Sequence, residues 1–185
     1  MNTDAFWELI EDCRRQATGR DERLAWLHTE LSQRPVAEVV RFQASLEEVT
    51  DDGYSWELWA AAERIFGGWC SDDGFFYFRL WLVALGRVAF ERALAEPDTL
   101  ADAPEVRKLV GCPRSAWGED WPEWEELDYV AATAFESLTG THDEGNTFYD
   151  LVEAEDGRST KSDAEPAGIR WDVRDEAEVT QRLRG

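Results

Sequence analysis

The residues best suited to chemistry lie together in one short stretch, GGWCSDDGFFYFR, which spans residues 67–79. Six of its side chains are our candidate ligand- or partner-binding residues: Trp69, Cys70, Ser71, Asp72, Asp73 and Arg79. Adjacent carboxylates suit Mg²⁺ or Ca²⁺, which prefer oxygen ligands, so Asp72 and Asp73 are the only metal candidates. A cysteine at a helix N-terminus can act as a nucleophile when its pKa is depressed, which makes Cys70 a candidate nucleophile.

The same stretch also fits the junction between two helices. The glycine pair 67–68 suits the end of one helix, and Ser71 is a preferred N-cap for the next. Asp72 and Asp73 would then lie in the first turn, where negative charge interacts favourably with the helix dipole. Like charges raise the pKa of a thiol, so these carboxylates oppose a reactive Cys70. We favour the junction, and the sequence leaves both interpretations open.

Other ionisable groups give further candidates. Arg79 is surrounded by apolar residues, and a buried charge needs partners. We expect it to pair with an acidic residue of another helix or with the turn itself; the alternative is an anion-binding arginine that faces a cleft. A nucleophilic cysteine also needs a base, and the two histidines are His28, on an apolar helix face, and His142, in a polar segment. Glu123 and Glu126 share a predicted helix face and form a further carboxylate pair.

Apolar residues recur at helical spacing through residues 4–140, without strand-like alternation or an internal repeat. We predict an all-α fold, an irregular bundle of about six helices with a flexible acidic C-terminal tail, in which residues 1–140 form the helical domain. The predicted helices cover residues 4–17, 21–33, 35–50, 56–66, 71–96 and 122–139. The predicted N-caps include Asp4, Ser55, Ser71 and Asp120.

Two regions of this pattern are unusual. The helix predicted over 71–96 is apolar nearly all round in its first half, which is typical of a buried central helix. Gly86 lies inside it, where a close helix crossing would explain a glycine. Residues 98–118 look irregular, with short turns broken by prolines and glycines.

The composition changes after Gly140, and residues 141–185 are predicted to be an acidic linker and tail. Residues 141–168 are polar and acidic with few aliphatic side chains, so we expect a mobile linker. One short helix is expected within residues 169–185, where Trp171 is the only large anchor.

Charge limits the classes of partner. The 185-residue chain has 40 acidic residues against 19 Lys and Arg, a formal net charge of −21. A field of that sign repels nucleic acid and anionic membranes, so we expect neither as a partner, and it suits a basic protein. Three distant cysteines, Cys13, Cys70 and Cys112, argue against a disulfide framework and a zinc cluster. Without an N-terminal signal or a long apolar span, we expect a cytoplasmic protein.

Four segments of the chain carry a family resemblance: FWELIEDC, WELWAAAERI, GGWCSDDGFFYFRLWLVALGRVAFERALAEPDTLAD and WEELDYVAATAFESLTG. In this order, between about residues 4 and 140, they resemble the bacterial family catalogued as domain of unknown function 4240. Trp69 stands where members often have glycine. The resemblance implies a bacterial, cytoplasmic, α-helical protein and brings no reaction, cofactor or catalytic residue. Some relatives are associated with regulatory domains, which implies an accessory role.

These observations favour a non-enzymatic protein-binding or regulatory module without a cofactor. No phosphate-binding loop, dinucleotide glycine motif, metalloprotease helix motif or nucleophile elbow is present. Aromatic residues, which are favoured in binding hot spots, lie near the predicted loops: Trp69, Trp117, Trp121 and Trp124. The alternative is an enzyme or ligand-binding protein that depends on a small molecule or a divalent metal, with its site at the Gly67–Arg79 junction.

Overall fold

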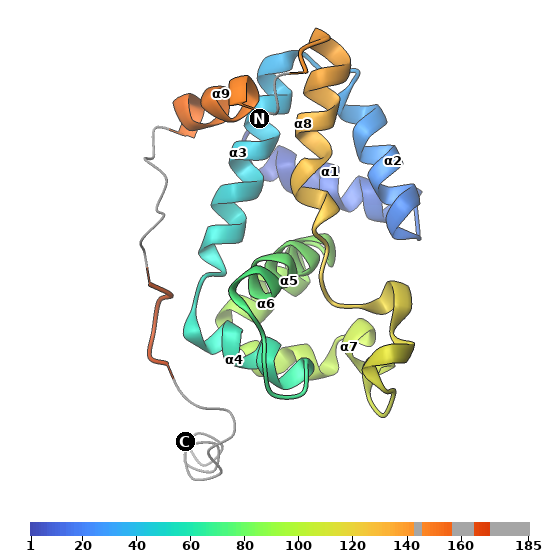
Figure 1. The fold of residues 1–185 in the computed structure, drawn as a ribbon, viewed down its shortest axis with the longest axis vertical. Coiled ribbons are helices and arrows are strands. Elements are labelled where there is room, and N and C mark those ends of the chain that lie inside the picture. The colour runs from blue at the N-terminus through green and yellow to red at the C-terminus, as the bar shows by residue number, and fades with distance from the viewer. Residues whose placement is uncertain (143–145, 157–164, 171–185) are drawn as a thin grey trace.

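The computed structural model describes residues 1–142, 146–156 and 165–170 (Figure 1). These residues form an all-α fold, as predicted, and the only β-type pairing among them is an isolated bridge between Ser55 and Ala167. The helices are α1 (Thr3–Gln16), α2 (Arg20–Leu31), α3 (Val36–Asp52), α4 (Trp56–Ile65), α5 (Asp72–Ala84), α6 (Arg87–Ala95), η1 (Pro97–Asp102), α7 (Pro104–Leu109), η2 (Arg114–Ala116), η3 (Gly118–Asp120), α8 (Glu126–Thr139) and α9 (Asn146–Asp156).

The helices form two connected groups (Figure 1). In one group α8 packs between α2 and α3, and α9 covers another side of α3. In the other group η1 contacts α4, α6 and α7, and α6 follows directly on α5. Helices α3 and α1 both contact α5 and so connect the two groups. No helix in the described ranges is long and apolar enough to cross a membrane.

Helix α5 is the buried central helix that the sequence predicts. Nine of its thirteen residues are buried, and they lie on every side of the helix. Phe75, Phe78 and Leu82 have no accessible surface. Each large apolar side chain removed from water contributes about 1.5–3 kcal/mol, so this helix supplies much of the core.

Side-chain caps fix several helix starts. The Ser55 hydroxyl accepts a hydrogen bond from the amide of Leu58 at 3.2 Å, as predicted for the start of α4. At α1 the predicted cap is wrong: Asn2, rather than Asp4, accepts from the amide of Ala5 at 2.8 Å. Asn2 lies three residues before Ala5, which is the usual spacing between an N-cap residue and the backbone amide that its side chain accepts from.

The start of α8 also differs from the prediction, which placed it at Pro122 with Asp120 as its cap. The helix begins at Glu126. The residues before it have other backbone partners: the Arg20 guanidinium donates to the carbonyls of Trp121 and Glu123, and the Trp124 amide donates to the carbonyl of Tyr77 at 3.0 Å. These tertiary bonds hold the segment outside the helix.

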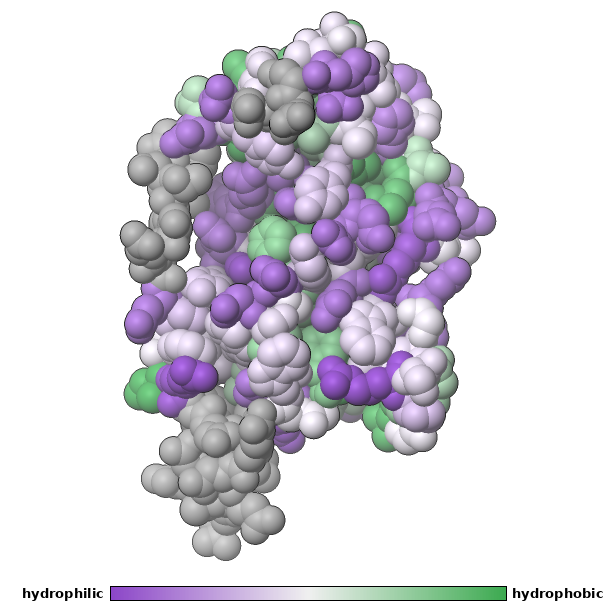
Figure 2. Space-filling view, in the orientation of Figure 1, coloured by the Kyte–Doolittle hydropathy of each residue, from purple (hydrophilic) through white to green (hydrophobic). Residues whose placement is uncertain are grey.

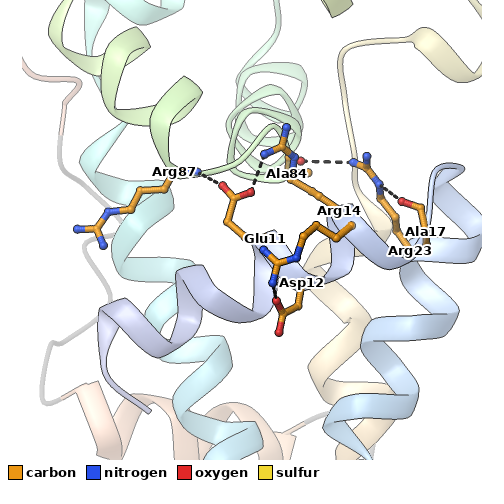
Figure 3. A network of polar contacts seen from close by, with 8 residues as sticks. Glu11, Asp12, Arg14, Ala17, Arg23, Ala84 and Arg87 are labelled. Carbon is orange, nitrogen blue, oxygen red and sulfur yellow. Dashed lines mark hydrogen bonds and ion pairs between the residues drawn. The ribbon is translucent and has the colours of Figure 1, made fainter.

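The single helix predicted over 71–96 is wrong, because the chain breaks at Gly86 into α5 and α6. Gly86 has φ +95° and ψ 164°, a conformation essentially restricted to glycine. Helix α1 crosses at this point, and a Cβ on Gly86 would collide with the side chains of Glu11 and Arg14. Glu11 accepts from the amide of Arg87 at 3.1 Å and pairs with Arg14 at 2.8 Å (Figure 3). The expected close crossing is therefore present, but it ends the helix.

Replacing Gly86 by alanine should destabilise the protein by about 2 kcal/mol or more, because the new Cβ meets both backbone strain and a steric clash. Gly111 is the matched control: its φ is +77°, but a Cβ there would have no atom within 4 Å. Gly111→Ala should cost only about 1 kcal/mol. Urea unfolding followed by tryptophan fluorescence measures both, and equal losses would contradict the crowding at Gly86.

The predicted mobile linker at 141–168 is wrong for the residues that the structure describes within it. Phe148 and Val152, one helical turn apart on α9, are buried. The Phe148 ring lies 5.2 Å from that of Phe135, and Arg41 pairs with Glu155 at 2.8 Å. One aromatic and one aliphatic side chain, Phe148 and Val152, therefore anchor this otherwise polar helix on the core. The short helix expected within residues 169–185 and the end of the flexible tail lie, from residue 171 onward, outside the described residues.

The last described segment, residues 165–170, also packs on the domain. Ala167 exchanges two backbone hydrogen bonds with the connection between α3 and α4, one to the carbonyl of Tyr54 and one from the amide of Trp56, each 2.9 Å long. The Arg170 guanidinium lies 4.9 Å from the centre of the Trp56 ring. This part of the predicted linker is thus held by backbone pairing and a cation–π contact.

A polar group is enclosed where α3 meets α8. The buried Gln43 amide nitrogen donates to Asp128 at 3.3 Å and to Glu47 at 3.1 Å. Burial raises the pKa of the Asp128 carboxyl, while the hydrogen bond from Gln43 lowers it and the charge of Glu125 raises it. Burial outweighs the single hydrogen bond, so the ionised carboxylate is disfavoured in the folded state.

This environment makes stability depend on pH. Because the folded pKa of Asp128 lies above its unfolded value, its contribution to stability is present at low pH and is lost as pH rises through the folded pKa. Asp128→Asn keeps an acceptor for Gln43 and removes the charge. The variant should therefore gain stability relative to wild type as pH rises from 4 to 8, measured as the difference in Tm. Asp150→Asn, at an exposed position of α9, is the control. A difference that does not vary with pH would contradict a desolvated Asp128.

Candidate functional site

The stretch Gly67–Arg79 forms the helix junction that the sequence favours. The glycine pair 67–68 has φ values of +78° and +113° and turns the chain after α4. The Ser71 hydroxyl accepts from the amide of Gly74 at 3.0 Å and caps α5. Asp72 and Asp73 follow in the first turn with exposed side chains. Whether the exposed groups also bind a ligand or partner stays a prediction.

Arg79 points into the protein, toward the C-terminus of α3. Its Nη1 donates to the carbonyl of Thr50 at 2.8 Å and lies 3.9 Å from the Asp51 carboxylate. Its guanidinium carbon lies 4.8 Å from the centre of the Tyr54 ring and 5.1 Å from that of Phe75. Arg79 as a residue is 6% exposed, which matches the expected pairing with an acidic residue of another helix rather than a cleft-facing arginine.

Burial lowers the pKa of Arg79 to about 10, and the charge of Asp51 opposes this. The guanidinium therefore stays cationic at neutral pH. The carbonyl that it binds belongs to the last turn of α3, where the helix dipole is negative, so the charge also stabilises that end. Arg79 thus acts as a tertiary C-cap for α3.

Cys70 is a buried thiol and not an activated nucleophile. Burial raises its pKa to about 12, and the charges of Glu123 and Glu63 add to this effect. The two histidines have other partners: His28 lies 3.2 Å from the hydroxyl of Ser137, and His142 lies 3.4 Å from Glu136. Both partners lie near the C-terminal end of α8, on the order of 15 Å along the helix from its start. The arrangement does not bring a histidine base to Cys70.

Glu123 belongs to the junction and not to α8. It precedes the helix, so the expected pairing with Glu126 on one helix face is wrong. A Cβ on Gly74 would lie 3.2 Å from the Glu123 carboxylate, 3.1 Å from the Ser71 hydroxyl and 3.5 Å from the Cys70 sulfur. Burial raises the pKa of Glu123, while a hydrogen bond from Trp121 lowers it. Gly74 therefore allows the loop before α8 to approach the start of α5.

A second contact fixes the same loop on α5. The Tyr77 hydroxyl donates to the Glu125 carboxylate at 3.0 Å. Burial raises the pKa of Tyr77 to about 12, and this hydrogen bond and the charges of Glu125 and Asp73 contribute. Asp73 and Glu125 consequently lie on one face of the molecule, although they are far apart in sequence.

The tryptophans expected at the surface divide into two groups. Trp69 is 62% exposed. Trp117 and Trp124 are buried, so their expected role at a surface hot spot is wrong. Trp117 lies 5.0 Å from Trp121 and 6.4 Å from Phe66, ring centre to ring centre, and forms part of an aromatic cluster. Their apolar rings pack on the core because the loop that carries them folds back over it.

Metal ligands are also sparse in the part of the chain that the structure describes. No three His, Cys, Asp or Glu side chains there are grouped so that they could hold a metal ion. Asp72 and Asp73 are exposed at the start of α5 and form a carboxylate pair at most. A metal at this position would depend mainly on water for its ligands.

A pocket of about 580 Å³ was not anticipated from the sequence. It lies between α4, η1, α7 and η2, of which the last three fall in the region expected to be irregular. The residues that line it are Ala61, Arg64, Ile65, Phe66, Gly67, Pro97, Asp98, Leu100, Ala101, Val106, Leu109, Val110, Gly111, Cys112, Pro113, Arg114 and Trp117. The available signal was the presence of Leu100, Val106 and Leu109, apolar residues in a stretch that is otherwise rich in turn residues.

The family comparison concerns residues 1–137. Residues 1–137 match the family described as Protein of unknown function (DUF4240). The chain belongs to this family. The matched DUF4240 region runs from α1 into the last turn of α8 and contains the complete junction. No significant match was found among the curated proteins or among the solved structures.

The thiols of this DUF4240 protein should differ widely in reactivity. Cys112 is exposed, whereas Cys13 and Cys70 are buried with pKa values raised by burial to about 11 and about 12. Because the thiolate is the reactive form, native protein at pH 8 should be alkylated at Cys112 at least about tenfold faster than at Cys70. Iodoacetamide labelling followed by mass spectrometry measures this, with Cys112→Ser as the control. Rapid labelling of Cys70 would restore the nucleophile interpretation.

Proposed function

We propose that this chain is a non-enzymatic binding or regulatory protein of the bacterial cytoplasm that engages a basic protein partner. The proposed contact surface, which we call the Trp69 face, comprises Trp69, Asp72, Asp73 and Glu125. Trp69 carries the proposal, because it is 62% exposed although it lies in a tight connection between two helices. A tryptophan offers a large, rigid contact area, and this residue is enriched among binding hot spots.

The charge around Trp69 supports a basic partner. Asp72 and Asp73 are exposed beside it, and Glu125 is held on the same face by Tyr77. The chain as a whole has a formal charge of −21, and hydrophilic residues dominate the face drawn in Figure 2. Complementary charge accelerates encounter and suppresses wrong partners, while an aromatic anchor supplies affinity. A guanidinium of the partner can also stack on the exposed indole ring.

The alternative, an enzyme with its active site at the junction, has less support. Ser71 is engaged as a helix cap, Arg79 is engaged with α3, and Cys70 carries a protonated thiol. Catalysis needs a nucleophile, acid or base within reach of a reacting atom. The groups best suited to that task have structural partners instead.

Binding to an arginine-rich test peptide, nona-arginine, tests the Trp69 face. Trp69→Ala and the double variant Asp72→Asn/Asp73→Asn should each weaken binding by roughly tenfold, measured by calorimetry at physiological salt. The control is Glu8→Gln/Asp21→Asn, which removes the same charge from exposed positions of α1 and α2. It should change the Kd by less than about twofold, because screened charges at a distance act weakly.

Thermal unfolding accompanies these titrations. Asp73→Asn should alter stability by under about 1 kcal/mol, the range of a helix-dipole contact. Equal weakening by the Trp69-face and control variants would indicate attraction by net charge alone and would overturn the proposal. An unchanged Kd for Trp69→Ala would do the same.

A further inference from the structure

The pocket between α4 and α7 has the dimensions of a small-molecule site. Its volume is about 580 Å³, within the range of roughly 300–1,000 Å³ that is usual for ligand pockets. Its wall is mainly apolar, with Phe66 from the end of α4, Leu100 from η1 and Leu109 from α7. Val110, at the same wall, is 75% exposed. An apolar cavity with an exposed valine beside it is suited to the hydrocarbon body of a ligand.

The pocket wall has few charged side chains, and their positive and negative charges are unequal in number. The lining residues with a charge are Arg64, Asp98 and Arg114. Arg64 pairs with Asp98 at 3.1 Å. Arg114 has no ion pair and donates no hydrogen bond among the residues that the structure describes, and its charge lowers the pKa of Glu123, which is not a lining residue. The pocket wall therefore carries one excess positive charge in a protein whose formal charge is −21.

The guanidinium of Arg114 is held in place by aromatic rings. Its carbon lies 5.5 Å from the centre of the Phe66 ring, 5.8 Å from that of Trp117 and 5.4 Å from that of Trp121. Stacking fixes the plane of the group, while its edges keep their N–H donors for an external acceptor. A planar guanidinium with available donors matches a carboxylate, which it can bind through two parallel hydrogen bonds.

We propose that this pocket binds a small amphipathic monocarboxylic acid. The hydrocarbon body occupies the cavity between α4, η1 and α7, and the carboxylate binds Arg114. The total charge of the protein repels anions, so burial of the hydrocarbon body supplies most of the affinity. Arg114 selects the acid over a neutral or cationic head group. The site is separate from the Trp69 face, although its wall reaches Gly67 at the start of the turn that carries Trp69.

Decanoate, decanol and decylammonium, each below the concentration at which it forms micelles, are the probes. The quenching of tryptophan fluorescence gives the Kd, because Trp117 lines the pocket. Wild-type protein should bind decanoate at least about tenfold more tightly than decanol, the contribution expected of a charge-assisted hydrogen bond. Arg114→Gln should remove this preference and leave the affinity for decanol nearly unchanged.

Two further variants complete the test. Arg107→Gln removes an equal charge from α7 outside the pocket wall, and it should keep the preference for decanoate. Ala101→Trp, at an exposed lining position, should fill the cavity and weaken all binding without unfolding the domain. Equal binding of decanoate and decanol by wild type, retention of the preference in Arg114→Gln, or absence of binding would each overturn the proposal.

Discussion

The buried guanidinium of Arg79 connects α5 to the end of α3, and the α4–α5 junction depends on this contact. A cation removed from water is costly unless its surroundings replace the lost hydration. Here the replacement comes from the Thr50 carbonyl, the Asp51 carboxylate and the faces of Tyr54 and Phe75. Because these groups belong to α3, the following turn and α5, all three segments are held in one arrangement.

That arrangement separates the junction into an inner and an outer part. The inner part consists of Cys70, Gly74 and Arg79, which pack against α3, α4 and the loop before α8. The outer part consists of Trp69, Asp72 and Asp73, whose side chains face solvent. A contact surface on a base with these tertiary contacts would lose little conformational entropy on association, which suits the proposed binding role.

Local interactions explain what the sequence could predict. The caps at Ser55 and Ser71 and the burial of α5 depend on residues within a few positions of one another, and these were predicted correctly. The pairing of Arg79 was also anticipated, because a charge within an apolar run requires a partner.

Contacts between segments that are distant in the chain explain the features that could not be predicted from the sequence. The break at Gly86 depends on side chains of α1, more than seventy residues earlier in the chain. The late start of α8 depends on Arg20 and Tyr77, and the burial of Trp117 and Trp124 depends on a loop that folds back. The pocket arises where α4 meets η1, α7 and η2, and these last three short elements have no strong helical pattern of their own. Gly86 indicated a close crossing, but the sequence pattern showed neither that α1 crosses there nor that the helix ends at this point.

The packing of the C-terminal segments has a practical consequence for shortened forms of the protein. The matched family region ends at residue 137, yet α9 covers α3 and Ala167 provides backbone partners for Tyr54 and Trp56. A chain cut at that boundary would expose the apolar surface of α3 and α8 that Phe148 and Val152 now cover. It would also leave two main-chain groups beside Ser55 without their protein partners. Such a fragment would be prone to self-association, because α9 and Ala167 pack on the matched region although they lie outside it.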